Sequence, residues 1–198
     1  MLTDEEISGY AGYVEELRLL IHELPIPANN RVRASAACFA IAQEHHHAIV
    51  TLVESRLYAA AFSLLRCEFE AYIRAEWLAQ CASDALIEDF IRGKEPPKIG
   101  CMLEQLEMLE TFNEKVLSRI KQKSWNAMCG YTHTGGLHVQ RWNSADGIES
   151  NYEKDEILEV LRFAEIIASI AVVGVAGLAA SDELALRALD SLKRRTQV

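Results

Sequence analysis

The chain has 198 residues, of which 50% are hydrophobic, and it carries a formal net charge of −9 at pH 7. This composition predicts a folded domain with a continuous core and excludes intrinsic disorder. The acidic balance argues against broad electrostatic binding to nucleic acid or to an anionic membrane. It leaves room for a local basic patch, such as Lys115, Arg119, Lys121 and Lys123.

Cysteine usage and the N-terminal sequence indicate a cytoplasmic protein. The five cysteines are scattered and odd in number, which fits neither a disulfide framework nor a zinc-binding cysteine pair. The N-terminal sequence MLTDEEISGY is acidic and lacks the basic and apolar regions of a signal peptide. No glycine-rich phosphate-binding motif, esterase motif or metalloprotease motif occurs. We therefore expect no cofactor.

Helix start and stop signals recur along the chain. Thr3 followed by Glu6 has the spacing of a capping box, and the prolines of PIPANN (residues 25–30) end the helix that begins there. The predicted helices cover about residues 3–24, 31–55, 57–81, 83–93, 99–109, 113–129, 152–180 and 182–195. The sequence thus predicts one all-α domain over residues 1–198, an antiparallel bundle of seven or eight helices. In it, residues 1–24 form an N-terminal helix, residues 31–180 the core bundle and residues 182–195 a C-terminal helix.

An uncharged stretch, IIASIAVVGVAGLAA, occupies residues 166–180. It is shorter than the ~20 residues that a membrane-spanning helix needs, so we expect no membrane association. Its alanines and the pair Gly174 and Gly177 favour a helix in close contact with its neighbours, either in the core or at a homodimer interface.

A charged stripe marks the helix expected at residues 57–81. Arg66, Glu70 and Arg74 are spaced four residues apart and therefore share one helix face. The stripe is either an exposed ladder of ion pairs or a charged network in a cleft. In the second case Arg66 and Arg74 bind an anion and Glu70 orients them.

The preceding helix contains the sequence EHHH at residues 44–47. Helical geometry places His45 on the apolar arc, as a hydrogen-bonded core residue, a ligand or a catalytic base. Glu44 and His47 have the Glu-x-x-His spacing of di-iron bundles, but no second copy of this element exists. A set of His45, Glu70 and His133 could bind zinc or iron if the fold brought them together. We assign no metal ligands.

The segment WNAMCGYTHTGGLHVQRW (residues 125–142) departs from the helical pattern. Asn126, Tyr131 and His133 end a helix, Gly135 and Gly136 form a turn, and Arg141 follows. These residue types fit phosphodiester chemistry, with His133 as acid or base and Arg141 stabilising charge. The alternative is a packed interhelical loop.

SLLRCEFEAYIRAEWL followed by WNAMCGYTHTGG resembles a group of bacterial all-helical proteins that are similar in outline to the HEPN superfamily. Many HEPN proteins are dimeric RNases of toxin–antitoxin and antiphage systems. The resemblance covers about residues 34–180 and implies a site at Arg66, Glu70 and His133. HEPN nucleases carry an arginine four to six residues before the histidine, and no arginine occupies that place before His133.

Three functional hypotheses follow from these patterns. The first is a bacterial, cytoplasmic, HEPN-like homodimer that binds or cleaves RNA or nucleotides in defence or stress response. Its catalytic residues are His133, Glu70 and Arg66, and its substrate-binding residues are Arg74, Arg141, Asn126, Tyr131 and His45. The second is a non-catalytic module that binds a protein partner, and the third is a metal-dependent bundle enzyme. The first requires that Glu70 and His133 line one solvent-reachable cavity.

Overall fold

The computed structural model describes residues 2–145 and 147–196, and this part of the chain is 77% helix with no strand. Its elements are α1 (Asp4–Ile21), α2 (Asn30–Glu54), α3 (Tyr58–Gln80), α4 (Asp84–Ile91), α5 (Ile99–Leu106), the short 3₁₀ helix η1 (Glu110–Phe112), α6 (Val116–Thr132), α7 (Gly136–Trp142), α8 (Lys154–Leu178) and α9 (Asp182–Thr196). The predicted all-α fold is confirmed.

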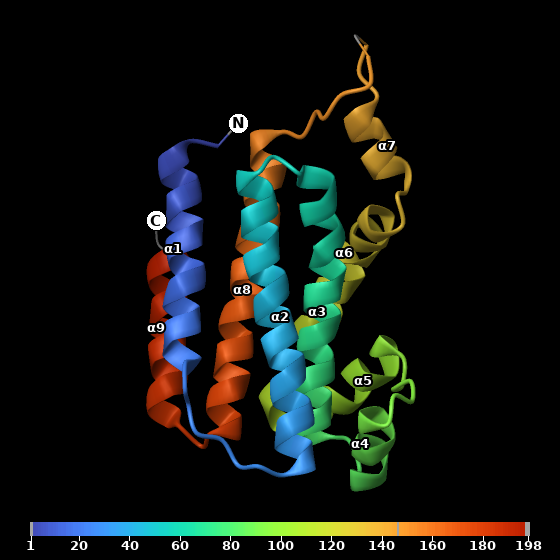
Figure 1. The fold of residues 1–198 in the computed structure, drawn as a ribbon. Coiled ribbons are helices and arrows are strands. Elements are labelled where there is room, and N and C mark those ends of the chain that lie inside the picture. Colours follow the sequence, from blue (N-terminus) through green and yellow to red (C-terminus); the bar gives the residue numbers. More distant parts are fainter. Residues whose placement is uncertain (1, 146, 197–198) are drawn as a thin grey trace.

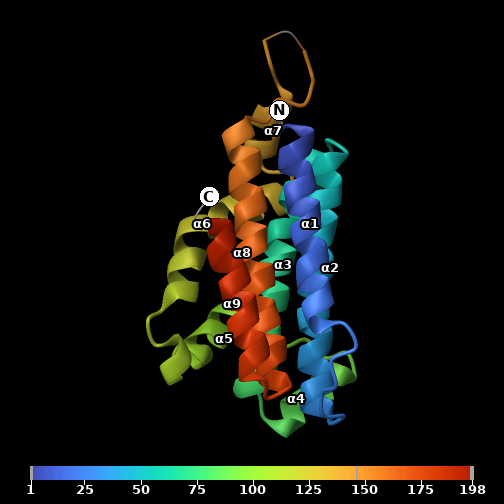
Figure 2. The same cartoon turned by 90° about the vertical axis from the view of Figure 1, so that its left-hand side faces the viewer.

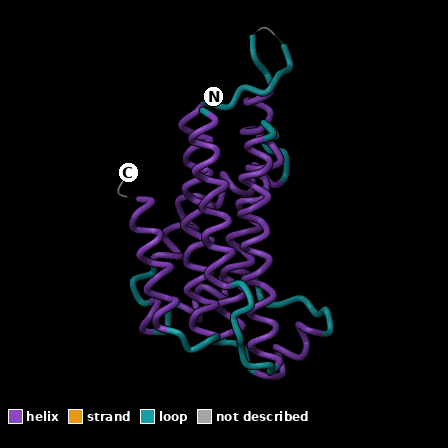
Figure 3. Tube along the Cα trace, turned by 60° about the vertical axis from the view of Figure 1, so that its left-hand side comes forward, coloured by secondary structure: helices purple, strands orange, loops and turns teal. Residues whose placement is uncertain are grey.

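Five long helices, α1, α2, α3, α8 and α9, run side by side as a bundle (Figures 1 and 2). Helices α4 and α5 lie at one end of it, and α6 and α7 flank the outer side of α3 (Figure 1). The segment that joins α7 to α8 extends beyond the opposite end (Figure 3). Helix α3 is therefore covered by α2 and α8 on its inner side and by α6 on its outer side.

Local capping chemistry sets several helix boundaries as the sequence predicts. The Thr3 hydroxyl accepts a hydrogen bond from the Glu6 amide, and the Glu6 carboxylate accepts one from the Thr3 amide, which completes a capping box at α1. Asn29 caps α2 by accepting from the Val32 amide at 3.0 Å. These bonds satisfy amide groups that the first turn of a helix leaves unpaired.

The described residues form nine α-helices rather than seven or eight, because residues 136–142 fold into α7 instead of a loop. Gly135 makes the reversal from α6 to α7 by packing directly on the Gly130 backbone. A Cβ atom on Gly135 would lie 3.0 Å from the Gly130 Cα atom. Gly135 and Gly136 therefore form a tight turn, and Gly136 is the first residue of α7.

Helix α8 is the centre of the core. The apolar residues 166–180 belong mostly to this 25-residue helix, which among the described helices is the one long and apolar enough to cross a membrane. Yet 61% of its most apolar window is buried inside the protein, as in the core helix of a soluble protein. The expected contact with neighbouring helices of the core is thus observed, and the homodimer interface stays a prediction.

Gly174 lets α8 approach α2 and α3 closely. A Cβ atom at this position would lie 2.2 Å from Cζ of Phe39 on α2 and 2.9 Å from Oε1 of Glu76 on α3. Neither atom has room to retreat, because Phe39 is fully buried and Glu76 is 6% exposed. By contrast, nothing lies within 4 Å of a Cβ atom added to Gly177.

An ion pair attaches the last helix to this core. Glu165 of α8 is 5% exposed, and it accepts a hydrogen bond of 3.1 Å from Nε of Arg195 on α9. The Arg195 guanidinium also lies over the rings of Tyr10 and Tyr13 of α1, at 5.0 and 5.2 Å from the ring centroids. Burial raises the pKa of Glu165, and Arg195 opposes this shift. Helices α1, α8 and α9 thus meet around one guanidinium.

Two buried polar side chains have no hydrogen-bond partner among the described residues. His46 and Glu68 are both 0% exposed, and neither ring nitrogen of His46 nor carboxyl oxygen of Glu68 is paired. Burial lowers the pKa of His46 to about 3. Burial also raises the pKa of Glu68 well above its ordinary value. Burial thus favours the neutral form of both groups, and their unpaired polar atoms lower the stability of the fold.

We predict that Gly174→Ala destabilises the protein. Alanine favours a helix over glycine by about 1 kcal/mol, but overpacking at a filled site costs about 1–3 kcal/mol, and Phe39 blocks the new methyl group. Gly177→Ala, in the same helix with open space around it, is the control and should be neutral or stabilising. Urea unfolding of both variants measures the difference. Equal stability of the two variants would contradict the close approach.

We also predict that Glu68 makes the protein less stable as pH rises. The unfolded chain loses this proton near the ordinary pKa of glutamate, whereas the folded chain retains it, so unfolding becomes easier above that pH. Glu68→Gln removes the linkage, so its stability relative to the wild type should be greater at pH 8 than at pH 5. Glu104→Gln, at an exposed site on α5, is the control for the loss of a carboxyl group. If the difference in unfolding free energy between Glu68→Gln and the wild type is the same at pH 5 and pH 8, the prediction is refuted.

Candidate functional site

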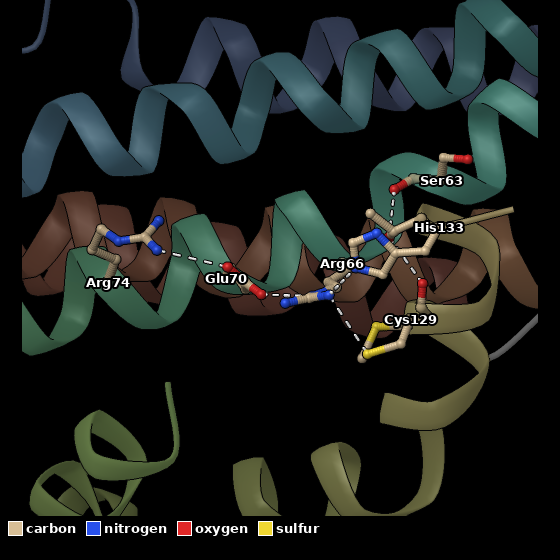
Figure 4. Close-up of polar contacts among 8 residues, drawn as sticks. Ser63, Arg66, Glu70, Arg74, Cys129 and His133 are labelled. Atoms are coloured by element: carbon tan, nitrogen blue, oxygen red, sulfur yellow. Dashed lines mark hydrogen bonds and ion pairs between the residues drawn. The ribbon is translucent and has the colours of Figure 1, made fainter. Parts of the chain in front are cut away.

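Arg66 is the centre of a polar cluster where α3 meets α6. Its Nε atom donates a hydrogen bond of 2.7 Å to Oε1 of Glu70, one turn further along α3. Its Nη1 atom lies 2.9 Å from Nε2 of His133, the residue that caps the C-terminus of α6 (Figure 4). Arg74 approaches the other carboxylate oxygen of Glu70 at 3.7 Å. The i, i+4 spacing that predicts a stripe on α3 therefore produces a continuous chain of contacts.

Helix α6 supplies the facing residues through the same spacing. Lys121, Trp125 and Cys129 lie four residues apart and end at His133. The Arg66 guanidinium lies 4.7 Å from the centroid of the Trp125 ring, and the Lys121 ammonium lies 5.2 Å from it. Arg66 also contacts the Cys129 sulfur at 3.6 Å. We call these seven residues, Arg66, Glu70, Arg74, Lys121, Trp125, Cys129 and His133, the α3–α6 seam.

The hydrogen bond between Arg66 and His133 defines the protonation of the imidazole. A guanidinium has only N–H donors, so Nε2 of His133 must accept and cannot carry a proton. The proton of the neutral ring is then on Nδ1. Nε2 of His133 is thus an acceptor nitrogen that Arg66 covers.

The seam is positively charged and reachable from solvent. It holds the permanent cations Arg66, Arg74 and Lys121 but one carboxylate, Glu70. The side chains of Arg66, Glu70 and Arg74 are 24%, 21% and 26% exposed, and His133 is exposed. At such half-buried positions charges interact more strongly than in bulk water. The seam therefore suits an anion in spite of the acidic surface elsewhere.

Of the five predicted substrate-binding residues, only Arg74 joins the seam, through Glu70. Arg141 is one of the four that do not. Arg141, on α7, forms a bidentate ion pair with Glu156 of α8, with its Nε atom 2.8 Å from Oε2. This pair ties α7 to the start of α8. The expectation that Arg141 and His133 share a cleft is corrected accordingly, because the partner of Arg141 is a carboxylate from a third helix.

Tyr131, Asn126 and His45 also lie outside the seam. The Tyr131 ring packs edge-on against Phe62 with the centroids 5.1 Å apart, so it belongs to the core between α3 and α6. Asn126 is exposed on α6 and joins none of the seam's hydrogen bonds. His45 is half-buried on α2, on the far side of α3, and burial lowers its pKa.

His138 is a buried residue whose position the sequence did not predict. It is 5% exposed, its Nδ1 atom lies 2.7 Å from the Tyr152 hydroxyl, and its Nε2 atom lies 3.4 Å from the Ser63 hydroxyl. Burial lowers its pKa. His138 thus fastens α7 to α3 and to the segment before α8. No single-sequence signal distinguishes it from the exposed His133 nearby.

Two cavities flank the seam, and Glu70 and His133 line neither. One, of about 180 Å³, lies between α3, α6 and α8 and includes Phe62, Met128 and Phe163. The other, of about 680 Å³, is open and lies between the start of α3 and α7, where Ser63 and His138 are part of its wall. Glu70 and His133 do meet through Arg66, as expected, but along a surface seam rather than inside one cavity.

The described residues contain no group of three or more His, Cys, Asp or Glu side chains placed to hold a metal ion. The set of His45, Glu70 and His133 is therefore not assembled, because α3 separates His45 from the other two.

The chain belongs to a family of unknown function, DUF6988, whose model matches residues 39–194. This match includes the whole α3–α6 seam and α7. No curated protein and no solved structure matches the chain.

Proposed function

We propose that the α3–α6 seam binds a phosphate group of RNA or of a nucleotide, and that His133 acts on it as a general base. The observation that carries this proposal is the position of the Arg66 guanidinium, 2.7 Å from Glu70 and 2.9 Å from His133. Glu70 holds the plane of the guanidinium, and the Nη atoms remain directed toward His133 and solvent.

Phosphate recognition needs donors in a fixed arrangement and local positive charge. Arginine provides both, because its planar fork matches two phosphate oxygens. Arg74, which approaches Glu70, and Lys121, which lies over the Trp125 ring, supply further charge to the seam. The Trp125 ring covers one face of the guanidinium and reduces its contact with water.

Ligand binding would also uncover the base. Arg66 donates through Nη1 to Nε2 of His133. A phosphate oxygen is a stronger acceptor and competes for the same donor. Once Arg66 turns to the phosphate, Nε2 is free to accept a proton. His133 caps the C-terminus of α6, where the helix dipole favours the imidazolium that forms.

The reaction that fits these groups is metal-independent transesterification of RNA. His133 takes the proton of a ribose 2′-hydroxyl, the 2′-oxygen bonds to phosphorus, and the bond from phosphorus to the 5′-oxygen breaks. The leaving 5′-oxygen receives a proton from the imidazolium or from water. Arg66 stabilises the charge on the phosphate oxygens in the transition state.

The missing HEPN arginine has a spatial counterpart in this proposal. The family pattern places an arginine four to six residues before the histidine, and Arg66 stands beside His133 from a different helix. We therefore retain a HEPN-like RNA-directed role, in bacterial defence or stress response and in a cytoplasmic homodimer, as part of the proposal.

A second candidate function is a non-catalytic interaction module. It is favoured by the fact that Arg66 already has protein partners on both helices. In this case the seam would be a clamp that holds α6 on α3.

We predict that Arg66→Gln weakens binding of a labelled single-stranded RNA at low salt by about tenfold or more, because one charged hydrogen-bond donor is worth about 1.5–3 kcal/mol. The slope of log affinity against log salt concentration should become shallower by about 1, as expected for the loss of one phosphate contact. The matched control is Arg92→Gln, which removes the same charge at an exposed site of α4. Fluorescence anisotropy measures both. Equal affinities of the two variants would remove the proposal.

We further predict that His133→Ala abolishes RNA cleavage while retaining RNA binding. His47→Ala, at an exposed position on α2, is the control. The readout is the appearance of products with 2′,3′-cyclic phosphate ends. If the wild type neither binds nor cleaves RNA and both Arg66→Gln and His133→Ala lower the melting temperature strongly, the clamp is the correct reading.

A further inference from the structure

The cavity of about 680 Å³ at the start of α3 has the size and lining of a small-molecule site. Ala59 and Ala60 of α3 form one wall, and Val139 and Trp142 of α7 form the opposite wall. The Trp142 side chain is 41% exposed at this cavity although it is large and apolar. Such an exposed aromatic wall is typical of binding sites for flat, apolar ligands.

The cavity also has polar groups. The Ser63 hydroxyl, the His138 ring and the Asn143 side chain are among its lining residues. The Ser63 hydroxyl donates within the protein, to the Tyr131 carbonyl, so toward a ligand it acts as an acceptor, whereas the Asn143 amide has both a donor and an acceptor group. Nδ1 of His138 lies 2.7 Å from the Tyr152 hydroxyl, and this contact holds the His138 ring of the cavity wall in place. The wall is therefore positioned before a ligand arrives.

The cavity and the α3–α6 seam are neighbours. Ser63 lines the cavity and lies three residues before Arg66 on α3 (Figure 4), a separation of about 4.5 Å along the helix axis. Thr134 lines the cavity and directly follows His133. An apolar pocket with a few polar groups thus borders a cationic seam that has no such pocket of its own.

We infer that the cavity holds the base of a nucleotide whose phosphate lies at Arg66. This inference rests on the proposed phosphate site and adds the recognition of a nucleobase to it. A nucleotide joins a flat, hydrogen-bonding ring to an anion through one ribose, which is the combination that the cavity and the seam present side by side. Trp142 stacks on the base, while Ser63 and Asn143 contact its polar edge.

The test compares ligands that share a phosphate and differ in the base. Ribose 5-phosphate and the four nucleoside 5′-monophosphates are titrated into the full-length protein by calorimetry. At least one nucleotide should bind about tenfold more tightly than ribose 5-phosphate, because stacking on an aromatic side chain contributes an effect of this order. Ala60→Phe fills the cavity from an exposed helix position and should remove this advantage while leaving ribose 5-phosphate binding unchanged. Ala40→Phe, the same change at an exposed site of α2, should retain it.

Trp142→Ala is a second variant that removes the aromatic wall, and its melting temperature is measured beside that of the wild type. If nucleotides and ribose 5-phosphate bind equally, or if the advantage survives in Ala60→Phe, the base pocket is refuted. In that outcome, weaker binding of all ligands to Arg66→Gln still supports the phosphate site. If no phosphate ligand binds, or Arg66→Gln changes nothing, the phosphate site and the inference built on it both fail.

Discussion

The close packing of α8 against α2 and α3 governs the rest of the molecule. Gly174 allows it, because the space that a side chain would take is occupied by Phe39 and by the Glu76 carboxyl group. Burial raises the pKa of Glu76 to about 7. The close contact of the three helices therefore buries a carboxyl group. Helix α3 is consequently buried on the sides that face α2 and α8.

This arrangement leaves one sector of α3 for polar chemistry. Arg66, Glu70 and Arg74 occupy that sector, and α6 packs beside it. Because α3 is packed on these sides, the backbone that carries Arg66 is held in place, and Glu70 orients its guanidinium. In the proposed function, ligand binding therefore needs only the turn of the Arg66 side chain from His133 to the phosphate.

The features that could be predicted from the sequence are those that depend on the spacing of residues close together in the chain. The helix boundaries near Thr3 and Asn29 follow from capping chemistry, and the charged stripe on α3 follows from its four-residue period. The contact of Arg66 with His133 joins residues that are 67 positions apart. It was expected through a family resemblance and not from spacing, since no local pattern encodes the pairing of α3 with α6.

Arg141 shows why the other expectation for this segment was wrong. Its residue type suits phosphate binding, but its partner Glu156 stands fifteen positions later on another helix. The corner at Gly135 turns α7 so that Arg141 points to α8 and His138 points to Ser63. A pair of glycines signals a turn, and the direction in which the chain leaves that turn is decided by tertiary packing.

Charge limits the kind of anion that the seam can take. The chain carries a net charge of −9, which repels a polyanion as a whole, and the attraction of the seam's cations is screened beyond a Debye length of about 8 Å. Within the seam, Arg66, Arg74 and Lys121 can neutralise only a few phosphates. A long duplex would extend over the acidic surface, whereas a mononucleotide or the end of a single strand would not. In the proposed function, the acidic protein with its small cationic seam would therefore bind short or unpaired ligands, and the neighbouring apolar cavity would accept an unstacked base.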